Sequence, residues 1–546
     1  MTPSRGGGAR AIALRALPLA PLLGVIAYAV VLAQRVPSLV TDTATSDSVG
    51  PMVIADSLPD ARPGSNVVMG NAAHYTTLWF DELTRSLPGH STVWQAMPYV
   101  LSLLGLLLLA ATVWRLAGWH GALLTLAIGV ATPPLLLVPL LAQAYHSTTF
   151  VNGIVLAALL VWLARTARLR SPLVAVVTAL VAVITGLDVA SDPLLLVTGV
   201  APFAAAALLV AWRRRERLAV ETLIAAGSAT VLALAVAGVT TLVMRHAGYQ
   251  VIGLPLRIAS PQRAQDNLTL LGHLVLDMAN GRLGLTGAGS LGVLRLVCGV
   301  LAVVAAFVPL YFLLRVATTR NPPAGNGKTT DLARDLFLAF WGCTAVFLAL
   351  AFAGTTLALD TNSIRYLPPL FYAVAATVPF VAPRLPWRRA LICAAVTFVG
   401  ITGAVLLHRA ALAGDFNVAP QDAQPLIALL EQHGVHRGYA GYWQANLLTW
   451  ESGGAVESRA VQQSPDCRAQ QPGWFCPYPI FTISDWYTPQ KGPTFLIRER
   501  RGAFVPDPPP PSPAPRETFS YGRFDVYVYS DDIGAAAAAA AAGWPG

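Results

Sequence analysis

The sequence predicts a polytopic α-helical membrane protein with about eleven spans and a small α/β domain outside the membrane. Of its 546 residues, 55% are hydrophobic and only 12% are charged. Soluble globular proteins carry about 25% charged residues, so this chain falls outside that class. The apolar residues also come in blocks of about 20, which is the length that crosses about 30 Å of hydrocarbon.

Each apolar block predicts one helix. The predicted spans are 12–36, 94–113, 120–141, 150–164, 171–187, 193–212, 218–243, 292–314, 335–358, 364–383 and 388–407. The first block is long for a signal peptide and has no convincing small-residue cleavage site, so we expect it to be retained as a span.

Basic residues predict the orientation, because Lys and Arg in short loops stay on the cytoplasmic side. Every second loop is basic, as is the segment before the first span. The basic residues are Arg5, Arg10 and Arg15, then Arg115, then Arg165, Arg168 and Arg170, then Arg213, Arg214, Arg215 and Arg217, then Arg315, Arg320, Lys328 and Arg334, and finally Arg384, Arg388 and Arg389. The N-terminus is therefore expected inside and the C-terminus outside. The net charge of +9 reflects this bias, so it does not indicate nucleic-acid binding.

Four regions follow from this topology. Residues 1–11 are a cytoplasmic N-terminus, and residues 12–412 form the membrane body with a long acidic first outer loop at 38–93. Residues 413–530 form the outer domain, and 531–546 are a low-complexity tail. The outer domain begins with a helix at "QDAQPLIALLEQHGV", a strand at "HRGYAGYW" and a helix at "QANLLTWES", and later has strands at "GPTFLIRER" and "RFDVYVYS". A stiff polyproline stretch, "VPDPPPPSPAP", interrupts it.

The cysteines fit this sidedness. Three of the five, Cys298, Cys343 and Cys393, lie in predicted spans as small apolar side chains. Cys467 and Cys476 are the two in the outer domain, where an oxidising compartment favours a disulfide over the alternative of a metal pair. HExxH and CxxC patterns are absent, so the sequence predicts no structural metal site. "GNGKTT" lacks the first glycine of a phosphate-binding loop.

Most side chains suited to chemistry fall on the predicted outer face. The stretch "LVTDTATSDSVGPMVIADSL" holds Asp42, Asp47 and Asp56 and no base, so it is either a solvated loop or acid–base equipment at a bilayer surface. Further candidates for a headgroup pocket are His74, His146, Asp188 and Asp192. Loop histidines are often merely exposed. Asp188 and Asp192 are either in water or functional, since buried acids are costly in lipid. Asp192 precedes Pro193, an arrangement typical of a helix N-cap.

Several of these stretches carry a resemblance to a known family. A first span followed by "SDSVGPMVIADSL" resembles the start of the polyprenyl-phosphate-sugar-dependent glycosyltransferases of the C superfamily (GT-C). "HYTTLWFDELTRSLPGHSTVWQAMPYVLSLLGLLLL", "GLDVASDPLLLV" and "IRYLPPLFY" match further parts. "HRGYAGYWQANLLTWES" is similar to the outer domain of bacterial members related to aminoarabinose and mannosyl transferases. The chain departs from the family at "VVMGNAAHYTTLWFDE", where members usually have a second acidic or aromatic-glycine stretch, so the acceptor side stays unassigned.

The resemblance implies that an Asp shortly after the first span is catalytic. An inverting transfer from a polyprenyl-phosphate sugar needs a carboxylate base for the acceptor hydroxyl and cations for the leaving phosphate. We expect Asp47 to be the base, with Asp56 as the alternative. We expect Asp42 to be an ordinary loop residue. Arg365 with Tyr366 is expected to hold the donor phosphate, although a cation at a helix end also simply snorkels to the interface. Arg257 and Arg263 are further candidates for contact with the donor phosphate.

The expected function is a membrane glycosyltransferase in the bacterial inner (cytoplasmic) membrane, with its active site on the extracytoplasmic face. Its partners would be the bilayer, a polyprenyl-phosphate-linked sugar donor and a lipid or polysaccharide acceptor of the cell envelope. The sequence assigns no cofactor, and a divalent cation at Asp47 stays open because some superfamily members use one. Two alternatives remain: a transporter or flippase of lipid-linked sugars, and a catalytically inactive member acting as a scaffold. Transporters tend to have internal repeats and broken helices, and no repeat relates the two halves of this sequence.

Overall fold

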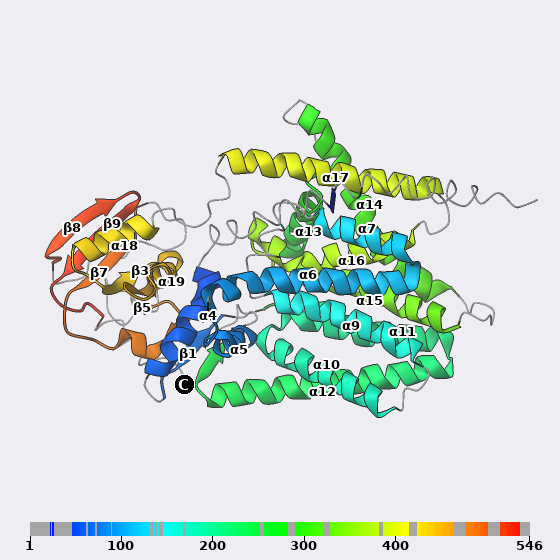
Figure 1. Cartoon of the computed structure of the whole chain (residues 1–546), viewed down its shortest axis with the longest axis horizontal. Helices are drawn as coiled ribbons and strands as arrows, with labels where there is room; N and C mark the ends of the chain where they lie inside the picture. Colours follow the sequence, from blue (N-terminus) through cyan, green and yellow to red (C-terminus); the bar gives the residue numbers. More distant parts are fainter. Residues whose placement is uncertain are drawn as a thin grey trace, which may run out of the picture. The chain divides into compact units, whose positions relative to one another are not determined.

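A computed structural model gives the fold of the chain. It describes residues 46–61, 64–70, 74–88, 90–131, 146–166, 171–251, 256–281, 290–319, 328–381, 386–413, 423–462, 476–500 and 514–534, together with Leu22, Val25, Ile26, Leu136 and Leu140. The chain divides into two compact units (Figure 1). Unit 1 comprises residues 1–39, 96–238 and 254–414, and unit 2 comprises residues 40–95, 239–253 and 415–546.

Unit 1 is built from helices. Those with long apolar stretches are α6 (His90–Ala117), α7 (Trp119–Val130), α9 (Ser147–Arg165), α10 (Pro172–Ser191), α11 (Ala201–Arg214), α12 (Arg217–His246), α14 (Ser290–Thr318), α15 (Lys328–Gly354), α16 (Pro368–Thr377) and α17 (Pro386–Ala413). Among the residues that the structure describes, unit 1 also contains the amphipathic α13 (Pro261–Asp277) and three short helices: the π-helical η5 (Leu196–Val200) and the 3₁₀ helices η6 (Thr361–Tyr366) and η7 (Val378–Phe380).

Helix α15 is the centre of unit 1. It contacts α9, α11, α13, α14 and α16, and Figure 1 shows it running among them. Its large side chains Phe337, Phe340 and Trp341 are fully buried. At Gly342 an added Cβ would lie 2.6 Å from the Cβ of Leu313, so α14 and α15 approach each other where a side chain is missing. Small residues at such contacts are typical of helix packing in membranes.

Helices of this kind make the chain a multi-pass membrane protein. Among the described residues, eight helices are long and apolar enough to cross a bilayer, and two shorter apolar helices, Trp119–Val130 and Pro368–Phe380, accompany them. These ten helices fall within or overlap ten of the eleven predicted spans. The predicted span 12–36 lies almost entirely outside the described residues. The count of eleven and the orientation therefore stay predictions.

Contacts at one end of unit 1 join loops that were predicted to share the cytoplasmic side. Arg165 donates to the carbonyl of Arg115 at 2.8 Å, and Arg213 donates to the carbonyl of Thr318 at 3.0 Å. Arg214 of α11 forms an ion pair with Asp335 of α15, with 2.6 Å between Nη2 and Oδ2. Three large side chains near this end, Trp114, Trp119 and Trp212, are 51–61% exposed, as is typical of a membrane interface.

Unit 2 combines three separate stretches of chain. The first contributes α4 (Ser46–Ser57), η2 (Leu58–Asp60), β1 (Val67–Met69) and α5 (His74–Thr84), and the second contributes β2 (Tyr249–Val251). The third contributes β6 (Thr482–Ile483). Strand β1 pairs in parallel with β2 and antiparallel with β6, so one small sheet ties all three stretches together. The described part of the loop that was predicted to be the first outer one, 38–93, therefore packs with the C-terminal part of the chain.

A six-stranded sheet forms the rest of unit 2, in the order β5-β4-β3-β7-β9-β8. The strands are β3 (Arg437–Ala440), β4 (Glu457–Gln462), β5 (Cys476–Pro477), β7 (Thr494–Glu499), β8 (Glu517–Tyr521) and β9 (Phe524–Tyr529). The central pairs β3–β4 and β3–β7 are parallel, and the outer pairs are antiparallel. Helices α18 (Ala423–Gln432) and α19 (Tyr442–Glu451) share one hydrophobic core with inward side chains of β3, β4, β7 and β9. The opposite face packs around Tyr439, Tyr487 and Leu496.

The five elements predicted for the outer domain coincide with α18, β3, α19, β7 and β9. Strands β4 and β8 were not predicted. Cys476 is disulfide-bonded, whereas Cys467 lies outside the described residues, so their pairing stays a prediction. The other three cysteines are free and buried, within helices.

Candidate functional site

A buried polar cluster joins three of the predicted outer segments in unit 1. It contains the start of α9, the turn after α10 and the end of η6. The Nδ1 atom of His146 lies 2.8 Å from Oδ2 of Asp192, and the ring of His146 meets the edge of Tyr366 at 5.5 Å between ring centres. Side chains far apart in the sequence thus gather at one end of the helical body.

The spacing of α9 explains how the two acids are held. Thr148 and Asn152 are four residues apart and both donate to Asp188, at 2.8 and 2.6 Å. His146 and Thr149 are three residues apart and both contact Asp192, with 2.5 Å from the Thr149 hydroxyl. Residues three and four apart lie on the same side of a helix, so adjacent strips of α9 serve the two acids.

Both acids are buried, with 1% of each exposed, so the explanation that they are solvated is wrong. The physical reason is the set of hydroxyl and amide donors, which satisfies carboxylates that would otherwise be costly away from water. Asp192 also accepts from the backbone N–H of Leu194 at 3.0 Å, an N-cap-like contact in line with the role expected before Pro193. The π-helix η5 follows shortly after, and Thr344 of α15 donates to the carbonyl of Thr198 within it. Such π-helical turns are frequent at functional sites.

Arg365 lies at the edge of this cluster. It is half-buried, its Nη2 donates to the Tyr366 hydroxyl at 3.1 Å, and its guanidinium lies 5.1 Å from the centre of the Tyr366 ring. Asp360 begins η6 with a capping box involving Ser363, which fixes the short helix that carries Arg365. The cluster therefore has a cation, an aromatic hydroxyl and a histidine on two neighbouring segments.

The segment that carries Arg257 and Arg263 runs beside the end of α15. The backbone N–H of Arg257 donates to the side-chain hydroxyl of Thr356, whose own N–H donates to the Arg257 carbonyl. Arg263 donates to the carbonyl of Ala358. The side chain of Arg257 is exposed.

Asp47 lies in unit 2, in the first turn of α4. The hydroxyl of Tyr442, at the start of α19, donates to Oδ1 of Asp47, and Ser46 donates to the carbonyl of Tyr442. Tyr442 stacks on Tyr478 with 4.4 Å between ring centres. Burial raises the pKa of Tyr478, and the charge of Asp47 raises it further. Asp47 is thus a half-buried carboxylate beside two aromatic rings.

Asp56 lies at the other end of α4 and is exposed. Its Oδ1 is 3.9 Å from Nη2 of Arg85, and the same arginine contacts the buried Asp81 at 3.5 Å and Glu82 at 3.3 Å. Arg85 also donates to the carbonyl of Ala55, so it ties α5 to the end of α4. His74 is the first residue of α5, and its side chain lies outside what the structure describes. Asp42 lies outside the described residues as well.

The predicted site residues therefore fall into two sets. His146, Asp188, Asp192, Arg365 and Tyr366 come together in unit 1, whereas Asp47 and Asp56 belong to unit 2. Sequence reasoning missed Thr148, Thr149 and Asn152, although the run "HSTTFVN" at the start of an apolar span carried a signal in its three- and four-residue spacing. It also missed Tyr442, for which the sequence offered no signal.

Among the described residues, no group of three or more His, Cys, Asp or Glu side chains is placed to hold a metal ion.

Comparisons with known proteins give a distant likeness only. Two crystal structures of the Archaeoglobus fulgidus oligosaccharyltransferase are similar to this chain. The first, tethered to an acceptor peptide containing the NVT sequon, has 12% identity and a TM-score of 0.41 over 81% of this chain and 64% of that one. The second, in complex with Zn and sulfate, has 12% identity and a TM-score of 0.38 over 77% and 58%. This chain thus spans less than two thirds of either. No family model and no curated protein matches the sequence.

Proposed function

We propose that this protein is an inverting membrane glycosyltransferase that moves a sugar from a polyprenyl-phosphate donor to a lipid or polysaccharide acceptor of the bacterial cell envelope, on the outer face of the inner membrane. The observation that carries the proposal is the buried cluster of unit 1. There three predicted outer segments bring an arginine, a tyrosine, a histidine and two acids together at one end of a membrane-spanning helical body.

Arg365 is the proposed partner of the donor phosphate. A guanidinium presents several N–H donors in a planar fork, which suits the oxygens of a phosphate. Tyr366 orients it by a hydrogen bond and by the ring that lies beside it. The ring of His146 packs against the Tyr366 ring, and the contact of His146 with Asp192 fixes the position of the imidazole. As the bond from the sugar C1 to the phosphate oxygen breaks, negative charge grows on that phosphate, and Arg365 stabilises it.

Asp47 is the proposed general base. The acceptor hydroxyl oxygen forms the new bond to C1, its proton passes to the Asp47 carboxylate, and polyprenyl phosphate leaves with the electron pair of the broken bond. The half-buried position and the Tyr442 hydrogen bond support this role, because they fix the carboxylate in a defined orientation. The role of Asp47 is argued from its contacts within unit 2, and the role of Arg365 from its contacts within unit 1.

The test is sugar transfer by the purified full-length protein in detergent, from a radiolabelled polyprenyl-phosphate sugar to envelope glycan acceptors. Asp47→Asn should lower the transfer rate by about 10²–10⁴-fold, the usual contribution of a general base. The amide keeps an oxygen that accepts the Tyr442 hydrogen bond, so the anchoring of α4 survives while the base is lost. Glu82→Gln, an exposed acid of the same loop, is the matched control and should transfer at the wild-type rate.

Arg365→Ala should raise KM for the donor and also lower kcat, since the phosphate charge is greatest in the transition state. Arg217→Ala removes an arginine that is 84% exposed, and it should change neither constant. Detergent removes the two compartments that a transporter needs, so wild-type transfer in detergent contradicts the transporter alternative. Absence of transfer from every donor supports the scaffold alternative. Loss of transfer in Asp56→Asn but not in Asp47→Asn would move the base to Asp56.

A further inference from the structure

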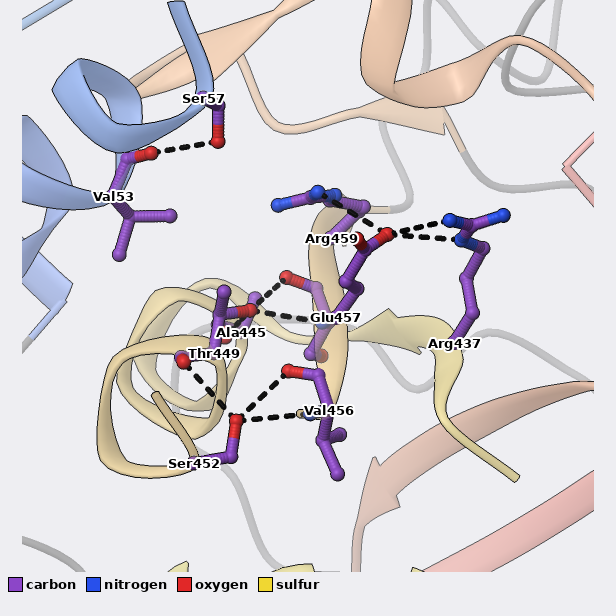
Figure 2. A network of polar contacts seen from close by, with 10 residues as sticks. Val53, Ser57, Arg437, Ala445, Thr449, Ser452, Val456, Glu457 and Arg459 are labelled. Atoms are coloured by element: carbon purple, nitrogen blue, oxygen red, sulfur yellow. Dashed lines mark hydrogen bonds and ion pairs between the residues drawn. The ribbon is translucent and has the colours of Figure 1, made fainter. Parts of the chain in front are cut away.

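A second polar site lies wholly within unit 2, and of its residues the proposed function considers only Asp56, the alternate base. It is a cavity of about 750 Å³ between α4 with η2, the end of α19, strands β3 and β4, and η8 (Ser484–Tyr487). Figure 2 shows part of its wall, where Arg437 and Arg459 point to either side of the Glu457 carboxylate. We call it the α4–β4 pocket.

The sheet explains why these charged side chains share one wall. Arg437 of β3 is the register partner of Glu457 in β4, and Arg459 follows Glu457 by two residues. Side chains two apart on a strand, and those paired across strands, point to the same face. Arg437 Nε and Nη2 both lie 2.9 Å from Oε2 of Glu457, while Arg459 Nη2 lies 3.5 Å from the same oxygen. One carboxylate is thus shared by two arginines.

Arg459 is the unusual member of this group. Only 8% of it is exposed, and its Nη1 has no hydrogen-bond partner among the residues that the structure describes. Burial lowers the pKa of its guanidinium from the ordinary value, while the charge of Glu457 opposes that change. A buried donor without an acceptor is costly, so an acceptor on a ligand would stabilise it.

The pocket is also lined by carboxylates, which can accept hydrogen bonds from a ligand. Its acids are Asp56, Asp60, Glu451, Glu457 and Asp485. These five carboxylates outnumber the two arginines, so a simple anion would meet repulsion there. Two indole rings, Trp450 and Trp486, also line the cavity, and the guanidinium of Arg459 lies 4.2 Å from the centre of the Trp486 ring.

We propose that the α4–β4 pocket binds a neutral glycan through its hydroxyl groups. A sugar hydroxyl both accepts and donates hydrogen bonds, so one ligand can accept from Arg459 Nη1 and donate to the surrounding carboxylates. The apolar C–H face of a pyranose or furanose ring fits against an indole, and the volume of the cavity is within the usual range for small-molecule sites. The inference does not depend on the proposed function, because binding needs no sugar donor.

The test measures the binding of neutral tetrasaccharides to the full-length protein in detergent by isothermal titration calorimetry. The probes are maltotetraose, cellotetraose and mannotetraose, with inorganic phosphate and a lysine-rich tetrapeptide as charged comparisons. At least one tetrasaccharide should bind, and Arg459→Gln and Trp486→Phe should each weaken that binding by about tenfold, which equals about 1.4 kcal/mol. Arg516→Gln, an exposed arginine of the same unit, should leave the affinity unchanged.

Arg459 is packed against Trp486, so Arg459→Gln could fail to fold. Gln490→Ala, at the exposed rim of the pocket, then provides the comparison, with an expected loss of about threefold in affinity. Equal glycan affinity in wild type, Gln490→Ala and Trp486→Phe would overturn the proposal. Binding of phosphate alone, or of the lysine-rich peptide alone, would also overturn it and make the pocket an anion or a cation site.

Discussion

The buried cluster of unit 1 and the α4–β4 pocket of unit 2 hold their carboxylates in opposite ways. In unit 1, Asp188 and Asp192 are held by hydroxyl, amide and imidazole groups, mainly from a single helix. In unit 2, Glu457 is held by two arginines from two strands. Within a helical body surrounded by lipid, short polar side chains satisfy an acid without introducing further buried charge. A sheet at an aqueous surface tolerates full ion pairs, although each contributes little to stability.

The largest effect that we expect concerns the side of the membrane on which unit 2 lies, because a reporter fused to it lies either inside or outside. A reporter fused after Arg389 should lie in the cytoplasm, and one fused after Asp415 should lie outside, since basic loops set the orientation. Paired phosphatase and fluorescent-protein fusions report the two sides, with fusions at Arg215 as an inside control. A cytoplasmic reporter at Asp415 would put unit 2 on the wrong side for both the proposed base and a glycan pocket facing the envelope.

The second prediction compares a buried acid with an exposed one in unit 1. Asp192→Ala leaves the Thr149 hydroxyl, the Leu194 N–H and His146 without the carboxylate they contact. It should lower the free energy of unfolding by about 3 kcal/mol or more, because each buried donor left without a partner costs about 1–3 kcal/mol. Asp360→Ala removes an exposed capping acid and should cost only about 1 kcal/mol.

Thermal and denaturant unfolding in detergent, followed by tryptophan fluorescence, measures both variants. Equal losses in Asp192→Ala and Asp360→Ala would show that the buried contacts of Asp192 contribute no more than a surface cap. In that case the account given of how unit 1 holds its buried acids would have no energetic basis.

The sequence revealed the two regions unequally. His146, Asp188, Asp192, Arg365 and Tyr366 were recognised as candidates because polar side chains at the ends of apolar blocks are conspicuous. Their pairing was not predictable, since the contact of His146 with Asp192 joins two spans whose packing depends on many apolar side chains. Arg459 and Glu457 were missed for the opposite reason: charged residues are common in a polar domain. Their strand, "ESRAVQ", is short and carries no hydrophobic alternation.

The sequence also did not predict how the loop 38–93 packs against the rest of unit 2. The short β1 contains only three residues, and its partners β2 and β6 come from distant parts of the chain. Local pattern indicates neither partner, because pairing of this kind is set by long-range burial. Asp47 was identified from the resemblance, while its neighbour Tyr442 lies about 400 positions away in the sequence, beyond the reach of any local motif.

The smallest effect separates the two acids of the cluster, and it tests how evenly α9 supports them. Thr149→Val keeps the shape of the side chain and removes the hydroxyl that lies 2.5 Å from Asp192. Because Thr149 is fully buried, the loss should be about 1.5–3 kcal/mol, as for a hydrogen bond to a charged group. Thr148→Val removes a partly exposed donor to Asp188, but Asp188 still accepts a hydrogen bond from Asn152. The free energy of unfolding should therefore fall by only about 1 kcal/mol. Thr230→Val, whose hydroxyl contacts only its own helix backbone among the described residues, should be near neutral. Unfolding in detergent orders the three variants, and a loss in Thr148→Val as large as that in Thr149→Val would mean that the hydroxyl groups of α9 support Asp188 and Asp192 equally.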